Sequence, residues 1–374
     1  MLTPRAEWFP ASSGALAQVT DEEDGSGRPP VMADVARRAG VSQMTVSRVL
    51  NNHPGVRPAT RAKVLAAVAD LDYRPNTAAR ALVTGRTRVL GVVSVNTALF
   101  GPASMLVAIE RAAREAGYFV SIVSLSSPDR RALGDAIAHL GSQAAEGIIV
   151  IAPYAVTTAA LRHLPDNLPI VAVEGGKAPV PTVVVDQYLG ARRATRYLLS
   201  LGHPTVVHIA GPEDWHEARE RERGWRETLA TEGREAPPVV RGDWSPQSGY
   251  EAALSLAPMP ESSALFVGND QMAVGVLRAL HEAGVMVPDQ VSVVGFDDVP
   301  EAAYFSPPLT TIRQNFAEVG RRSLGLLLQQ VEGSPRPRTR VVIPPDLVVR
   351  DSTAPPSSRR RGGDAPLSLN TRSP

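Results

Sequence analysis

The sequence predicts an N-terminal all-α domain followed by an α/β core of two doubly wound lobes, each built on a parallel sheet. Residues 31–74 show only helical patterns, whereas from 89 to about 350 short β-branched runs alternate with amphipathic helical segments. Strands that alternate with helices indicate βαβ units and therefore parallel strands. Because this core spans about 260 residues, two lobes are favoured over a single sheet.

The expected elements of the α/β core follow from this alternation. Strands are predicted at 89–95, 119–125, 147–152, 169–174, 182–186, 206–210, 264–267 and 291–296. Helices are predicted at 104–116, 189–201, 219–229 and 271–283. In doubly wound sheets ligands bind outside the carboxyl ends of the strands, so the polar residues that follow these strands are candidate ligand contacts.

Composition sets the domain boundaries. Residues 1–30 and 353–374 are rich in Ser, Gly, Pro and charged residues without apolar periodicity, and both are predicted to be disordered tails. Between them lie the all-α domain at 31–74, a linker at 75–87 and the two-lobed core at 88–352. The C-terminal tail carries no leucine heptad that could join chains into a higher oligomer.

Several function classes are disfavoured by the residues that the chain lacks. The absence of cysteine excludes thiol nucleophiles, disulfides and thiolate metal sites. No nucleophile–base pair, metal-ligand spacing or phosphate-cradling glycine loop is recognisable, so we expect neither an enzyme nor a bound cofactor. No apolar run approaches the roughly 20 residues that span a bilayer, and no export signal is recognisable. A cytoplasmic protein without membrane contact is expected.

Charge is distributed unevenly along the chain. Residues 31–88 carry ten Lys or Arg and three Asp, which gives +7 in 58 residues. Because the whole chain has a net charge of +1, the remaining residues carry −6. A basic domain attached to a mildly acidic body is typical of a protein that binds a polyanion.

The segment 32–51 has the pattern of a helix-turn-helix. Ala36 provides the small residue at the helix crossing, and Gly40 suits the left-handed turn that ends the first helix. Ser42 is placed to cap the second helix, and Val46 is expected to pack near Ala36. Such a second helix enters the major groove of DNA, where amide and guanidinium groups read base edges.

The residues predicted to contact DNA lie on and after this second helix. They are Ser42, Gln43, Met44, Thr45, Ser47, Arg48, Asn51 and His53, with Thr45 near the backbone. A third helix at 59–71 is expected to close the small core through Val64, Leu65 and Val68. On the same helix, Arg61 and Lys63 are expected to face phosphates.

The run from residue 32 to 93 resembles the lactose-repressor (LacI/GalR) family of bacterial regulators. The similarity is carried by Val-Ser-x-x-Thr-Val-Ser-Arg-Val-Leu-Asn at 41–51 and Tyr-Arg-Pro-Asn at 73–76, and it continues to Arg350. The resemblance implies a periplasmic-binding-protein-like core that senses a small molecule. It also implies a repressor that binds a pseudo-palindromic DNA operator as a homodimer.

By the same resemblance, residues 76–83 form a hinge helix that enters the minor groove. Asn76, Ala79 and Leu82 are the implied DNA contacts, and Leu82 would be the side chain that wedges into a central base step. Unstacking bases costs a few kcal/mol, which contacts on the bent duplex offset. Isolated helices of this length are marginal in water, so we expect the hinge to fold only on DNA.

Polar side chains after the predicted strands suggest a site for a polyol. Asp186, Asn269 and Asp297 follow strands, Arg221 begins a helical stretch, and Trp244 offers a ring for an apolar sugar face. The resemblance implies that Arg221, Asn269 and Asp297 bind the effector and that Trp244 stacks on it. The resemblance also implies two further effector contacts. One is Gln314, at a crossover between the lobes, and the other is Glu174, which stands where the family commonly has a shorter aspartate.

Other interpretations stay open at this point. Asp186 and Asp270 are also suited to capping helices, and Asp298 suits a turn. Val95 and Ile151 stand where the lactose repressor has small polar residues, which predicts a more apolar first lobe. A sugar is the expected effector, the alternative being a purine or another metabolite that acts as corepressor. A solute-binding protein is a distant alternative, against which the DNA-binding segment argues.

Overall fold

The computed structural model describes residues 29–51, 53–74, 81, 85–95, 97–125, 128–165, 167–176, 178–256, 263–337 and 339–356. The chain divides into two compact units, Met1–Val83 and Thr84–Pro374, and the division falls within the linker predicted at 75–87. Most of the two predicted tails lies outside the described residues.

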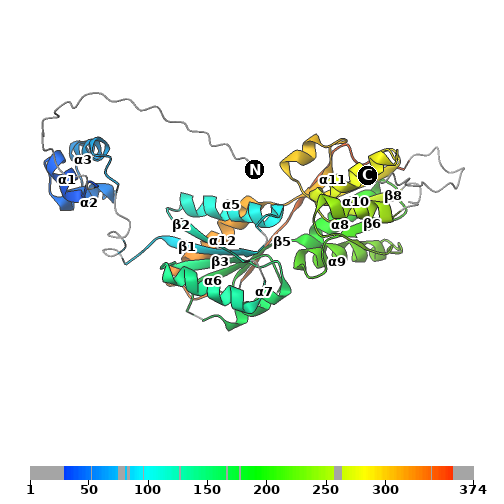
Figure 1. The fold of residues 1–374 in the computed structure, drawn as a ribbon, viewed down its shortest axis with the longest axis horizontal. Helices are drawn as coiled ribbons and strands as arrows, with labels where there is room; N and C mark the ends of the chain where they lie inside the picture. Colours follow the sequence, from blue (N-terminus) through cyan, green and yellow to red (C-terminus); the bar gives the residue numbers. More distant parts are fainter. Residues whose placement is uncertain are drawn as a thin grey trace, which may run out of the picture. The chain divides into compact units, whose positions relative to one another are not determined.

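Within the described residues, the first unit contains three helices, α1 (Met32–Ala39), α2 (Gln43–Leu50) and α3 (Pro58–Asp70), as predicted (Figure 1). Gly40 has a φ of 64° and ends α1, and the Ser42 hydroxyl accepts a hydrogen bond from the Thr45 amide at 3.2 Å. This conformation costs a glycine little, because it has no Cβ.

The core of this unit is small, and one residue predicted for it lies elsewhere. Its buried residues are Val35, Ala36, Val46, Val49, Val64, Ala67 and Tyr73. Leu65 was expected in the core, but half of it is exposed, and the prediction is wrong. Ala67 is buried three residues after Val64 because i and i+3 share a helix face, whereas i+1 points away from it.

The first lobe of the second unit is built on a six-stranded sheet whose order is β11-β5-β4-β3-β1-β2. All paired strands in it are parallel. Its strands are β1 (Val89–Val95), β2 (Phe119–Leu125), β3 (Gly147–Ile151), β4 (Ile170–Val173), β5 (Thr182–Val185) and β11 (Arg340–Ile343). Its helices are α5 (Phe100–Glu115), α6 (Arg130–Ser142), α7 (Ala155–Ala160), η1 (Leu161–His163) and α12 (Phe316–Val331).

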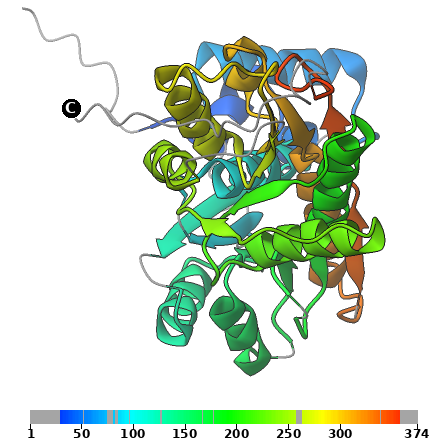
Figure 2. The ribbon, with the colours of Figure 1, turned by 90° about the vertical axis from the view of Figure 1, so that its right-hand side faces the viewer.

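The second lobe repeats this architecture with the sheet order β12-β10-β9-β8-β6-β7, in which only the β10–β12 pair is antiparallel among the described strands. Its strands are β6 (Val207–Ala210), β7 (Val240–Arg241), β8 (Ser263–Val267), β9 (Val291–Asp297), β10 (Thr310–Arg313) and β12 (Asp346–Val348). Its helices are α8 (Gln187–Ser200), α9 (His216–Thr231), α10 (Pro246–Ser255), α11 (Asp270–Glu282) and η2 (Pro300–Tyr304). Figure 2 shows helices on both sides of its strands.

Each sheet is covered on both faces, which explains why its central strands are almost wholly apolar. In the first lobe α5 and α12 pack on one face and α6 on the other. In the second lobe α8 and α9 cover one face, and α10 and α11 cover the other. The expected fold of two doubly wound lobes is therefore confirmed.

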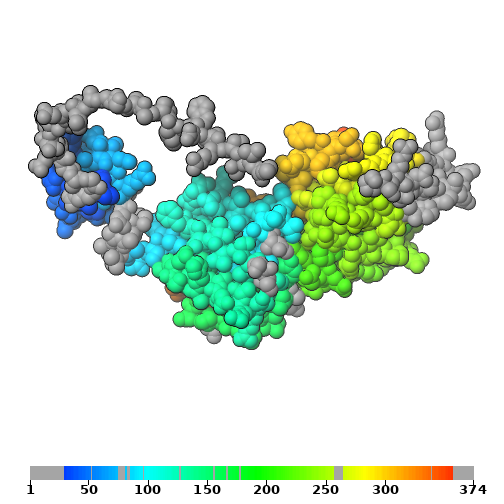
Figure 3. Space-filling view, viewed as in Figure 1, coloured from blue at the N-terminus to red at the C-terminus, as the bar shows by residue number. Residues whose placement is uncertain are grey.

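The described chain passes between the lobes three times, after β5, after β10 and after β11. The second lobe is thus inserted within the sequence of the first, and the two meet along the seam visible in the space-filling view (Figure 3). Two polar residues, Gln187 and Gln314, lie directly beside crossovers and hydrogen-bond each other at 2.9 Å.

The packed core extends past residue 352, where the disordered tail was predicted to begin. The Thr353 hydroxyl bonds to the Tyr197 hydroxyl at 2.9 Å, and the Ala354 carbonyl accepts from Ser292 at 3.0 Å. These contacts fasten the segment to the second lobe through polar groups, which an apolar-periodicity criterion does not detect.

Candidate functional site

The exposed face of α2 presents the side chains that were predicted to read bases. Gln43 and Arg48 are exposed, and Met44 is exposed by 67% although it is apolar. Val46 and Val49 turn the opposite face into the core. Because the buried valines fix the rotation of the helix, the polar face is held toward solvent without a partner having to order it.

The remaining predicted contacts of this helix form short local hydrogen bonds. The hydroxyls of Ser42 and Thr45 lie 3.0 Å apart, and the Asn51 amide donates to the Ser47 hydroxyl at 3.4 Å. His53 is exposed, and its Nδ1 accepts from the backbone amide two residues on at 3.2 Å. The three predicted hinge contacts Asn76, Ala79 and Leu82 lie outside the described residues.

Arg61 has a structural use that the sequence did not suggest. Its guanidinium donates to the carbonyl of Val49 at 3.3 Å and to that of His53 at 2.8 Å. Val49 lies in the last turn of α2, and His53 lies three residues beyond its end. Arg61 therefore ties α3 to the end of α2, which leaves fewer donors for the phosphate contact that was predicted.

A cleft of about 480 Å³, counted with its open side, lies between the two lobes of the second unit. The first lobe lines it with Leu99, Phe100, Gly101, Pro102, Met105, Pro153 and Glu174. The second lobe and the crossovers supply Gln187, Trp215, Glu217, Arg221, Trp244, Asn269, Asp297 and Gln314. Six of the seven predicted effector contacts are thus brought together from six distant parts of the chain.

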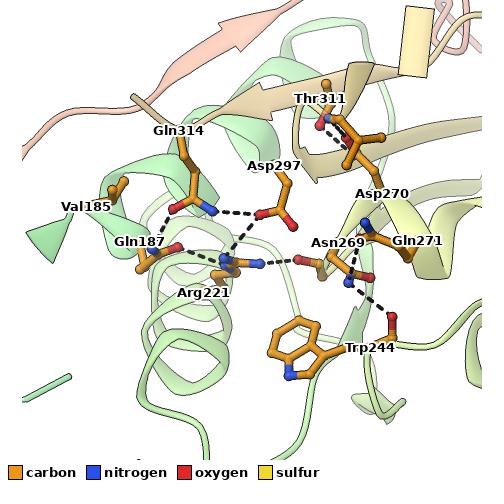
Figure 4. Close-up of polar contacts among 12 residues, drawn as sticks. Val185, Gln187, Arg221, Trp244, Asn269, Asp270, Gln271, Asp297, Thr311 and Gln314 are labelled. Carbon is orange, nitrogen blue, oxygen red and sulfur yellow. Dashed lines mark hydrogen bonds and ion pairs between the residues drawn. The ribbon is translucent and has the colours of Figure 1, made fainter. Parts of the chain in front are cut away.

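A chain of hydrogen bonds holds Arg221 at the centre of this cleft (Figure 4). The Arg221 Nε donates to Gln187 at 2.9 Å, and the Gln187 amide donates to Gln314. Gln314 in turn donates to Asp297 at 2.6 Å, and Asp297 lies 3.6 Å from the guanidinium of Arg221. The loop of contacts closes on itself, so each polar group is oriented before a ligand arrives.

Burial perturbs both members of the central ion pair. Desolvation raises the pKa of Asp297 to about 6, against the opposing effect of the nearby Arg221 charge. Burial also lowers the pKa of Arg221, although Asp297 and two glutamates favour its charged form. Clusters of such perturbed groups in a cleft are typical of functional sites.

Two glutamates lie next to each other at the first-lobe side of the cleft. Glu174 accepts from the Val185 amide at 3.2 Å, and Glu217 accepts from the Gly175 amide at 3.2 Å. Burial and the mutual repulsion of the two charges raise the pKa of Glu174 well above its usual value. Burial raises the pKa of Glu217 to about 7.

Aromatic rings form the wall around these charges. Trp215 packs edge-to-face against Trp244, with 5.6 Å between the ring centroids, and against Tyr154, with 5.1 Å between the centroids. The Trp244 ring lies directly on Gly211, where an added Cβ would collide with it. The Trp244 indole nitrogen is buried and has no hydrogen-bond partner in the described part of the chain.

Backbone strain is concentrated at the same place. Glu174, Trp244 and Asp297 have φ values of 62°, 76° and 114°, a region that non-glycine residues avoid. Each such residue costs of order 1–3 kcal/mol and persists where the surrounding structure fixes it. All three residues line the cleft.

Asn269 lines the cleft, but helix and loop contacts occupy most of its amide. Its oxygen caps α11 by accepting from the Met272 amide at 2.9 Å, and its nitrogen donates to the Trp244 carbonyl and to Gln271. Asn269 rather than Asp270 is therefore the cap. Asp270 is fully buried and accepts from the Val299 amide and the Thr311 hydroxyl.

Three other predictions for the cleft need correction. Asp186 does not line it but caps α8 by accepting from the Leu189 amide at 2.9 Å. Val95 and Ile151 are buried in the first-lobe core and do not line the cleft. The first-lobe wall is nevertheless apolar, as expected, through other residues such as Phe100 and Met105.

Gln187, Trp215 and Glu217 also line the cleft, although none of them was predicted from the sequence. A signal for Glu217 was present, because it precedes Arg221 by four residues and therefore shares a helix face with it. Among the described residues no group of three His, Asp or Glu side chains is placed to hold a metal ion. In the same part of the chain, no helix combines the length and apolarity that crossing a bilayer requires.

Comparison with known proteins identifies both units. Residues 31–76 match the model of bacterial regulatory proteins of the lacI family, and residues 195–353 match the model of a periplasmic binding protein-like domain. The lactose operon repressor of Escherichia coli K12 is 33% identical over 89% of this chain and 93% of its own length. The chain belongs to the lacI family.

Solved structures of lacI-family proteins have the same fold. The lac repressor dimer bound to operator and the anti-inducer ONPF matches with a TM-score of 0.75 at 32% identity, over 87% of this chain and 100% of that one. The complex of the regulator CelR with cellobiose has a TM-score of 0.63 at 31% identity, over 86% and 99% of the two chains. As a lacI-family member, the protein is a DNA-binding regulator of transcription.

Proposed function

We propose that this protein is a repressor that binds a pseudo-palindromic operator as a homodimer and that a sugar in the interlobe cleft controls its hold on DNA. The observation that carries the proposal is the closed set of contacts among Arg221, Gln187, Gln314 and Asp297 in a cleft walled by tryptophans. Fixed polar groups beside an aromatic ring suit a ligand with many hydroxyls and an apolar face.

A homodimer is supported by apolar side chains at one edge of the first lobe. β2 is the edge strand of its sheet, and it exposes 65% of Phe119 and 48% of Ile122. Val107 of the neighbouring helix α5 is exposed by 66%. An apolar, unpaired edge strand is a surface that another copy can cover. Two-fold symmetry of such a dimer would be mirrored in the operator.

The coupling between cleft and DNA is proposed to act through the crossovers. Gln187 and Gln314 lie beside two of them and contact Arg221 and Asp297, so a ligand on these groups changes the angle between lobes. The coupling energy, of order 1–3 kcal/mol in allosteric proteins, equals the difference in ligand affinity between the two shapes. For a sugar we propose an inducer, which favours the shape that releases DNA.

The protein is proposed to act by binding alone, without catalysis, and in the cytoplasm, where bacterial DNA lies. A sugar is favoured over other effectors because the cited relatives are a lactose operon repressor and a regulator solved with cellobiose. The purine alternative is tested beside it. Neither a purine nor a sugar needs a cofactor to act in this way.

The proposal is tested with purified full-length protein in two steps. A thermal-shift screen against mono- and disaccharides, nucleosides and purine bases identifies ligands of the cleft. Duplexes selected from a random inverted-repeat pool then serve in anisotropy titrations at several salt concentrations, with and without each hit. We expect a salt-sensitive preference for one repeat that a sugar weakens. Absence of any preferred repeat would refute the repressor, and a response to purines alone would refute the sugar.

A further inference from the structure

The cleft contains more carboxyl groups than cationic groups. Of the described residues that line it, Glu174, Glu217 and Asp297 carry carboxyl groups, whereas Arg221 is the single cation. All four side chains are more than nine-tenths buried. Bulk water therefore screens their charges poorly, and the imbalance is felt by whatever enters the cleft.

Arg221 does not neutralise the glutamates by direct contact. Its nitrogens bond to Gln187, to the Gly268 carbonyl and to Asp297. Arg221 thus pairs with one carboxylate, Asp297, and acts on Glu174 and Glu217 only through space.

The two glutamates have acceptor capacity that the protein leaves unused. Each receives one backbone amide bond, from Val185 and from Gly175 respectively. The second oxygen of Glu217 is buried and has no hydrogen-bond donor in the described part of the chain, although the neighbouring Glu174 carboxyl could share a proton with it. A buried acceptor needs a donor, and without a ligand a proton shared with Glu174 provides it; a donor supplied by a ligand would take the place of that proton.

Trp215 adds an aromatic ring beside the two glutamates. It lines the cleft on the same helical segment as Glu217, and its ring contacts Trp244 and Tyr154 edge-on. The face of an indole ring attracts positive charge, most strongly where water is excluded. Carboxylates beside indole rings are a combination suited to an ammonium group.

We infer that the effector is a cationic sugar, an amino sugar whose ammonium group binds to Glu174 and Glu217 beside Trp215. This inference rests on the proposed function and specifies the chemical class of the ligand. Hydroxyls of the same ligand would bind to the unused donors of Arg221, and the charge of the cleft would be balanced by its occupant.

Proton release is a consequence that a neutral sugar would not share. In the empty cleft, burial and mutual repulsion favour one proton held between Glu174 and Glu217. An arriving ammonium group supplies the positive charge instead, so the shared proton leaves for the buffer. The other charged groups facing the pair, Arg221 and Asp297, keep their own contact and are not required to change.

The test compares matched ligands on the full-length protein by calorimetry. Glucosamine, galactosamine and mannosamine are each compared with the corresponding hexose and the N-acetylated form, in two buffers of different ionisation enthalpy. We expect one amine to bind about tenfold or more tightly than both partners, with release of up to one proton. Glu217→Gln should reduce that preference severalfold. Glu220→Gln, one turn away on the same helix and paired with Arg223 outside the cleft, should preserve it.

The possible outcomes separate the cationic ligand class from the proposal of a sugar-controlled repressor. If hexoses bind as tightly as their amines, or binding releases no proton, the cationic class is refuted while the sugar-controlled repressor stands. If no sugar of either kind binds, the sugar proposal fails as well. Each variant is also melted thermally. A transition as cooperative as that of the wild type shows that a lost preference for the amino sugar is not caused by unfolding.

Discussion

Replacing Glu217 with glutamine is expected to stabilise the two-lobed unit in a pH-dependent way. The amide preserves the shape of the side chain and the acceptor for the Gly175 amide, but it removes a charge that burial disfavours. The pKa of Glu217 is raised from 4.5 to about 7 in the folded protein. Between these two values the folded state binds more protons than the unfolded state, so wild-type stability falls as the pH rises.

The magnitude follows from the size of that pKa change. At pH 8 the buried charge costs the wild type about 3 kcal/mol, because each tenfold change in acidity corresponds to 1.36 kcal/mol. At pH 5 the side chain is largely protonated in the folded state, and the cost is about 1 kcal/mol. The gain of Glu217→Gln should therefore shrink about fourfold between pH 8 and pH 5.

Urea unfolding followed by tryptophan fluorescence measures this gain, since Trp215, Trp225 and Trp244 all report on the two-lobed unit. Glu220→Gln is the control, and its partly exposed ion pair with Arg223 should contribute within about 0.5 kcal/mol at either pH. If Glu217→Gln changes the free energy of unfolding equally at pH 5 and pH 8, or lowers it at pH 8, then burial does not disfavour the charge of Glu217.

Three further outcomes are expected. Gly211→Ala should lower the free energy of unfolding in urea by about 1–3 kcal/mol and weaken the response to sugar, because the added Cβ forces the Trp244 ring to move. Gly134→Ala is the control, because its Cβ meets no neighbouring atom, and it should cause neither loss. Arg48→Ala should weaken operator binding by about 1–3 kcal/mol in anisotropy titrations, and an equal loss of effector affinity would contradict the division into two units. Leu82→Ala should reduce DNA bending in gel-shift phasing assays, and unchanged bending would exclude the wedge.

The fold was predictable where local patterns agree with the tertiary structure. Buried strands such as β1 and β9 read as apolar runs, and their limits were predicted to within about one residue. The helices α6, α10 and α12 were not predicted, whereas α8, α9 and α11, which also contain glycine, were. In the structure Gly249 meets the backbone of α11, and Gly320 meets the backbone of α5. The glycines allow helices to approach closely, a benefit that a local pattern cannot show.

The cleft was predictable in its polar residues and less so in its geometry. Arg221, Asp297 and Gln314 were expected from their positions after strands or from the family resemblance, and they meet as expected. Sequence reasoning could not tell whether Asp186 caps a helix or contacts a ligand, because both uses suit a carboxylate after a strand. The contact of the Glu217 carboxyl with the Gly175 amide, which leaves its second oxygen without a donor, depends on where α9 meets the first lobe, and only the assembled lobes define that position.

The threading of the second lobe through the first has a consequence for synthesis of the chain. The sheet of the first lobe receives its last strand, β11, only when residues 340–343 have left the ribosome, whereas the three helices of the DNA-binding unit need only the first 70 residues. At about 5–20 residues per second, the DNA-binding helices exist for many seconds before the domain that governs them can close. A chain terminated before residue 340 would contain the DNA-binding helices but not the complete first-lobe sheet.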